Sequence, residues 1–128
     1  MNMNSYSYMT RALQWGGLLW VAGTIGIRLA GQYLLRPHRV LPTTLLYLIS
    51  FMLMAWVVRR ICQRLQLERE LWFKATTLLI LPTAILDPFS CLFFPRVFPN
   101  VDPAATGIFG GWMLICCGGA IAGAWFQR

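Results

Sequence analysis

The chain has 128 residues, of which 58% are hydrophobic and 12% are charged, and its mean hydropathy is +0.60. A soluble domain of this size needs more polar residues to cover its surface, so the composition indicates a membrane protein. The net charge of +7 does not favour nucleic-acid binding, because the eleven Lys and Arg residues fall between apolar runs, as in loops that border membrane spans.

The first predicted span covers residues 12–35, and its few polar residues include Arg28. About 20 mainly apolar residues cross a bilayer as a helix, so the run is long enough. It is not a signal peptide, because its apolar part is long and lacks a small-residue cleavage site. A basic turn follows, and the second predicted span covers residues 40–58.

Residues 59–74 hold five of the eleven positive charges and alternate them with large apolar side chains. This pattern is typical of a helix at the membrane surface, so we predict a cytoplasmic amphipathic linker here. Arg64 with Glu68, and Glu70 with Lys74, have the four-residue spacing of helical ion pairs.

The third predicted span covers residues 75–94 and contains Pro82 and Pro88. Each proline removes a backbone donor, so we predict a kinked or broken helix. Asp87 precedes Pro88, an order typical of a helix cap, and a half-helix is expected to begin there.

The fourth predicted span covers residues 105–126, after a second cap-and-proline pair, Asp102 and Pro103. Glycines at four-residue spacing allow two helices to approach closely. The predicted helix-contact glycines are Gly26, Gly107, Gly111, Gly119 and Gly123.

Together these runs predict one all-α transmembrane domain over residues 1–128, a four-helix bundle. Basic residues favour the cytoplasmic side of a membrane. Seven of them fall on one side of the predicted bundle and three on the other, so both termini are predicted to be cytoplasmic. The larger group is Arg11, Arg59, Arg60, Arg64, Arg69, Lys74 and Arg128, and the smaller is Arg36, Arg39 and Arg96. Trp15, Trp56, Trp72 and Trp125 are predicted to form an aromatic belt at the cytoplasmic boundary.

Two ionisable residues lie inside the predicted spans, Arg28 and Asp87. A charge in the hydrocarbon region is costly unless it is paired or hydrated, so both are candidate functional residues. They fall at similar depths and are predicted to meet. The meeting has two interpretations: a buried structural ion pair, or the polar site of a transporter that also includes Thr83 and Ser90.

We predict no catalytic residue, no metal and no cofactor. The four cysteines, Cys62, Cys91, Cys116 and Cys117, lack metal-ligand spacing, and His38 is the sole histidine. No nucleophile and base can be combined into a catalytic site.

Several short motifs in the C-terminal half carry a resemblance to known proteins. They are Leu81-Pro82, Leu86-Asp87, the run from Phe94 to Asn100, and Phe109-Gly110-Gly111-Trp112. With them the chain resembles an uncharacterised bacterial family of short four-span membrane proteins, a resemblance that implies a fold and no activity. The small multidrug transporters are similar in length and span number only, since they need a glutamate in the first span, where this chain has Arg28.

The leading hypothesis is a non-enzymatic accessory or assembly subunit of a membrane complex, or a self-associating bundle. The alternative is a small oligomeric transporter or channel with a polar site at Arg28 and Asp87. Expected partners are the lipid bilayer and other membrane subunits or further copies of the chain. The expected location is a bacterial inner membrane or a thylakoid-like membrane.

Overall fold

The computed structural model describes residues 5–126, and every regular element in that part of the chain is helical. Four long helices make up most of it: α1 (Ser5–Leu34), α2 (Val40–Arg64), α3 (Arg69–Leu92) and α5 (Thr106–Trp125). A single turn, α4 (Phe94–Val97), and a 3-10 turn, η1 (Pro103–Ala105), connect α3 to α5. The predicted all-α class is confirmed.

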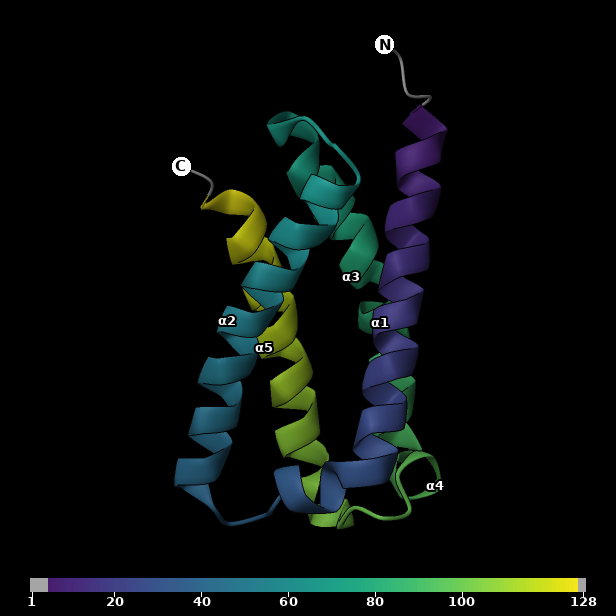
Figure 1. Ribbon diagram of the computed structural model, residues 1–128. Helices are drawn as coiled ribbons and strands as arrows, with labels where there is room; N and C mark the ends of the chain where they lie inside the picture. The colour runs from purple at the N-terminus through teal and green to yellow at the C-terminus, as the bar shows by residue number, and fades with distance from the viewer. Residues whose placement is uncertain (1–4, 127–128) are drawn as a thin grey trace.

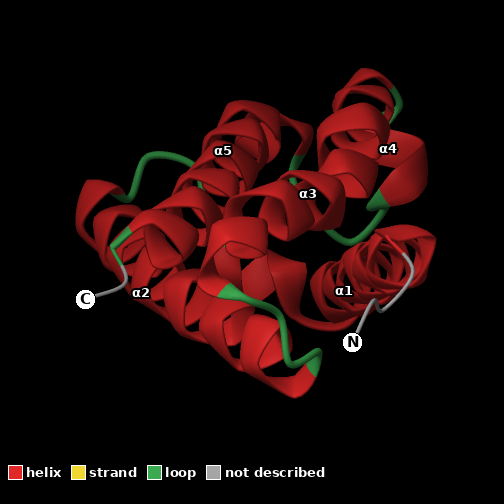
Figure 2. Cartoon of the chain, turned by 90° about the horizontal axis from the view of Figure 1, so that it is seen from above, coloured by secondary structure: helices red, strands yellow, loops and turns green. Residues whose placement is uncertain are grey.

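The long helices run up and down beside one another, so that α1 begins and α5 ends at the same end of the molecule (Figure 1). Helix α1 packs mainly on α3 and α2 mainly on α5, while α3 and α5 join the two pairs. Helices α1 and α2 are consecutive but barely touch. Viewed along the helices, α1 with α3 forms one side of the molecule and α2 with α5 the other (Figure 2).

Three segments are long and apolar enough to cross a membrane: Val40–Arg64, Arg69–Leu92 and Pro103–Trp125. Helix α1 is not among them, although it has 30 residues. Five glycines together with Gln14, Arg28 and Gln32 lower its hydropathy. The three apolar helices are the mark of a membrane protein by composition, and a fourth span does not follow from hydropathy.

The segment over 59–74, predicted to be a surface linker, is not a separate element of the structure. Helix α2 continues to Arg64 and α3 already begins at Arg69, so a short turn with Gln66 at φ 51° replaces the linker. Both helices therefore continue past their apolar residues, because a loss of hydropathy does not by itself end a helix. Because the turn intervenes, Arg64 and Glu68 share no helix, and neither predicted ion pair of this segment forms among the described residues.

The aromatic belt is also wrong in one member, because Trp72 is buried in the core and its indole nitrogen donates to the Leu67 carbonyl at 2.9 Å. Trp56 and Trp125 are exposed. Arg128, which was counted for the orientation, lies outside the described residues.

Helix α3 contains both prolines without a break, so the predicted half-helix at Asp87 is wrong. Proline removes one donor, which leaves the carbonyl four residues earlier without its helical bond, and a helix held on both sides tolerates this loss. Here α1 and α5 supply that support. The second cap is confirmed, because the Asp102 carboxylate accepts a bond of 2.9 Å from the Ala104 amide at the start of η1.

The buried core divides into two main clusters. One lies where α2 meets the start of α3 and the end of α5, and it includes Val58, Trp72 and Leu79. The other lies at the opposite end around Phe94, Phe98 and Phe109, whose ring centroids are 5.2–5.6 Å apart. Aromatic contacts at this distance stabilise the turn after α3 against the start of α5.

Candidate functional site

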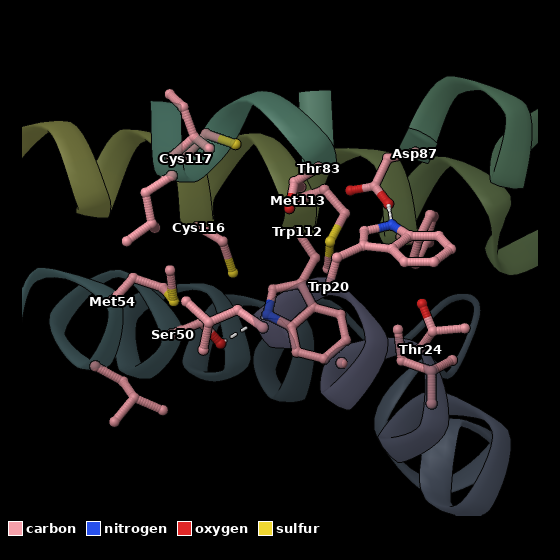
Figure 3. Close-up of a pocket in the computed structure, with 17 residues that line it drawn as sticks. Trp20, Thr24, Ser50, Met54, Thr83, Asp87, Trp112, Met113, Cys116 and Cys117 are labelled. Atoms are coloured by element: carbon pink, nitrogen blue, oxygen red, sulfur yellow. Dashed lines mark hydrogen bonds between the residues drawn. The ribbon is translucent and has the colours of Figure 1, made fainter. Parts of the chain in front are cut away.

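A cavity of about 200 Å³ lies between the two core clusters, and all four long helices contribute to its wall. Most of the lining is apolar. The polar exceptions come from α1, α2 and α3, and they are Trp20, Thr24, Ser50, Thr83 and Asp87, with Trp112 from α5 (Figure 3). A concave, mainly apolar space with a few polar groups is the usual form of a small-molecule site.

Asp87 is the only acidic residue of the cavity wall. Its side chain is 7% exposed, and one carboxylate oxygen accepts a bond of 2.9 Å from the Trp20 indole nitrogen. The other oxygen, Oδ2, is buried without a hydrogen-bond partner among the described residues. The carboxylate lies on the side of α3 that also carries Thr83 and faces the other helices (Figure 3). A carboxylate oxygen therefore lies inside the bundle without a hydrogen-bond or ion-pair partner among the described residues.

The opposite wall has one polar contact of its own. The Trp112 indole nitrogen donates to the Ser50 hydroxyl at 2.7 Å, which joins α5 to α2 and satisfies both groups. Around it, sulfur-containing side chains from α2 and α5 point into the same space: Met54, Met113, Cys116 and Cys117 (Figure 3). This wall is polarizable and apolar, and it offers no second charge.

The predicted meeting of Arg28 and Asp87 does not occur. The exposed Arg28 donates from Nε to the Val97 carbonyl at 2.7 Å, which attaches the end of α1 to α4. Asp87 bonds to Trp20 instead, and Arg28 does not line the cavity. Similar depth in two spans and the cost of an unpaired charge do not place two side chains on facing surfaces. Ser90 is buried but donates to the Leu86 carbonyl of its own helix, whereas Thr83 does line the cavity.

The five predicted contact glycines have different surroundings. Gly119 and Gly123 lie against the backbone of α2 at Phe51 and Ala55. Gly111 lies against the Tyr47 hydroxyl, which donates to the Ile108 carbonyl at 2.8 Å. Gly26 and Gly107 have open space where a side chain would extend. Gly119 and Gly123 therefore allow two helices of the same chain, α2 and α5, to approach closely.

In the part of the chain that the structure describes, no three His, Cys, Asp or Glu side chains lie close enough together to hold a metal ion. The four cysteines are free thiols.

Sequence reasoning missed Trp20, Ser50 and Trp112. A signal for the first was present: a buried indole N–H needs an acceptor, and Asp87 is the single acid in the predicted spans. No local pattern identified the second bond, since it joins residues 62 positions apart.

The model of a family of unknown function, DUF5367, matches residues 34–128, which is more than half of the chain. The chain belongs to this family. The motifs that resembled an uncharacterised family all lie inside the matched region, and the match itself carries neither a number of spans nor an activity. No curated protein and no solved structure matches the chain.

Proposed function

We propose that this member of a family of unknown function is a four-span membrane protein that binds a small organic cation in the cavity at Asp87 and carries it across the bilayer. The observation that supports the proposal is the carboxylate of Asp87, buried in the bundle with one oxygen unpartnered. A buried charge without a partner is costly, and a bound cation removes that cost.

The chemistry of the wall indicates the kind of cation. Indole faces attract positive charge, and Trp20 and Trp112 both line the cavity. Thioether and aliphatic side chains around them accommodate an apolar body. The volume of about 200 Å³ is below the range of typical drug sites, so the ligand is a small aromatic or alkyl ammonium ion.

A fourth span is supported by the packing of α1. Its Gly16 lies against the backbone of α3 at Leu79, and further along, Trp20 bonds to Asp87. A helix that follows a spanning helix over this length shares its depth in the membrane. The excess of basic residues at the end where α2 turns into α3 supports cytoplasmic termini in a bacterial-type inner membrane.

Binding is measured on the purified protein in mild detergent, with benzyltrimethylammonium as the probe and its uncharged carbon isostere neopentylbenzene as the comparison. We expect saturable binding of the cation alone. Asp87→Asn should lower the affinity for the cation at least tenfold, because it removes the charge but keeps the acceptor for Trp20. The matched control is Asp102→Asn, which also removes one carboxylate and leaves the cap of η1 in place.

Equal binding of the two probes, or unchanged cation binding by Asp87→Asn, contradicts the proposal. If the cation binds at Asp87, transport is measured as uptake of the labelled cation into vesicles that contain the protein. Binding without uptake would restrict the function to a receptor or sensor. In either case the chain acts without covalent chemistry, so we propose no enzymatic activity.

Assembly with a membrane partner or with further copies stays as the second candidate function. Gly26 favours it, because this glycine is exposed on α1 and a side chain there would have open space among the described residues. The mass of the complex extracted from its native membrane in mild detergent tests it. Stoichiometric foreign subunits would identify an accessory subunit, whereas a lone chain or homo-oligomer would exclude one.

A further inference from the structure

A second cavity lies between α1 and α2 at the basic end of the bundle, and its chemistry differs from that of the proposed cation site. Its volume is about 500 Å³, and we call it the basic crevice. Trp15 and Leu19 of α1 line one side. The other side is a face of α2, formed by Trp56, Val57, Arg60, Ile61, Gln63 and Arg64. The crevice lies between two helices that barely touch.

The charge of the crevice is positive and unneutralised. Arg60 and Arg64 are one helical turn apart on α2, and both are exposed. The Arg60 guanidinium lies over the Trp56 ring, 5.2 Å from its centroid, and no carboxylate pairs with either arginine in the described part of the chain. Two adjacent guanidinium groups with an amide from Gln63 form a donor set that fits a phosphate group.

The remaining wall is mainly apolar and includes Leu19, Val57 and Ile61. Val57 lies nearly one turn before Arg60 on α2, and Ile61 lies between the two arginines along the helix. Tryptophans such as Trp15 and Trp56 are enriched at the depth where lipid headgroups meet acyl chains. The crevice therefore combines two cationic groups with adjacent apolar side chains, as a phospholipid combines a phosphate with acyl chains.

We propose that the basic crevice binds one anionic phospholipid, with its phosphate between Arg60 and Arg64 and an acyl chain along Leu19, Val57 and Ile61. Basic pockets between spanning helices on the cytoplasmic side recognise anionic headgroups in this way. The proposal requires that the chain lies in a bilayer, but it does not require that the Asp87 cavity binds a cation.

The experiment is native mass spectrometry of the purified full chain, titrated with dioleoyl phosphatidylglycerol or with dioleoyl phosphatidylcholine. The two lipids share chains and phosphate and differ in net charge. We expect the anionic lipid to be retained about 25-fold more strongly, at about fivefold for each arginine. The double variant R60Q/R64Q should lose this preference. The matched control, R36Q/R39Q, removes two arginines from the opposite end and should keep it.

Equal retention of both lipids by the unaltered chain would overturn the proposal, and this comparison does not depend on the folding of any variant. A preference that survives in R60Q/R64Q would overturn it as well. A third arm adds inorganic phosphate to the phosphatidylglycerol complex. If millimolar phosphate displaces the lipid, the crevice is a site for free anions and the acyl chain contributes nothing; retention of the lipid supports the groove.

Discussion

The contact surface between α2 and α5, which we call the α2–α5 seam, allows a specific prediction about Gly119. A methyl group at this position would overlap the carbonyl oxygen of Phe51 and lie 3.0 Å from its Cα atom. Carbon atoms pack at about 3.5–4.0 Å, so the two helices would have to separate by about 0.5–1 Å. Backbone atoms cannot rotate away as a side chain does. Overpacking of this kind costs about 1–3 kcal/mol, against which alanine regains up to about 1 kcal/mol of helix propensity.

We therefore expect Gly119→Ala to lower the free energy of unfolding by about 1–2 kcal/mol. The adjacent Gly118 provides the control, because a methyl group there would lie 3.9 Å from the Phe51 ring, an ordinary contact. Gly118→Ala should be neutral or stabilising by up to about 1 kcal/mol. The assay is unfolding in mixed micelles with a denaturing detergent, followed by circular dichroism. Equal stability of the two variants would refute the reasoning, and a loss that depends on protein concentration would place the seam between copies of the chain.

Three further predictions use the same unfolding assay. Phe98→Ala should lower the free energy of unfolding by about 3–5 kcal/mol, because this side chain is 1% exposed in the aromatic cluster. Phe89 is 59% exposed, so Phe89→Ala should lower it by less than about 1 kcal/mol. Equal losses of stability would contradict the assignment of the core. Trp112→Phe should cost about 1 kcal/mol through its lost bond to Ser50, and the loss should vanish when Ser50 is already Ala. Asn100→Ala should lower the free energy of unfolding by about 1–2 kcal/mol, because the Asn100 amide donates to the Ile27 carbonyl at 2.9 Å. Unchanged stability would show that this bond does not hold the loop between α4 and η1 to α1.

Most of the helical fold could be predicted from local pattern. The start of α2 at Val40 and the Asp102 cap before α5 agree with the prediction, because proline and short polar caps act on their immediate neighbours. The end of α2 at Arg64 and the start of α3 at Arg69 did not agree with the prediction, because a charged segment of good helix formers extends both helices beyond their apolar residues.

The candidate site was harder to predict, because it depends on which faces of the helices meet. Asp87 was identified from the cost of a charge in an apolar span, an argument that needs no partner. The predicted partner of Asp87, Arg28, was wrong. Arg28 donates to the Val97 carbonyl, and Asp87 accepts its hydrogen bond from Trp20, 67 positions away. Rotation of each helix about its axis decides between such partners, and hydropathy along a helix does not say which neighbouring helix each of its faces meets.

The two proposed sites are adjacent in space, and this has a consequence for how a ligand enters the bundle. Leu19 lines both the Asp87 cavity and the basic crevice, so the two spaces share a wall at this side chain. The gap between α1 and α2 that forms the crevice is also the side on which the bundle is least tightly closed. A lipophilic cation concentrated at an anionic headgroup would therefore arrive beside Leu19, which also lines the cavity of the buried carboxylate. A lateral path from the lipid, rather than a pore along the bundle axis, is the route that this arrangement favours.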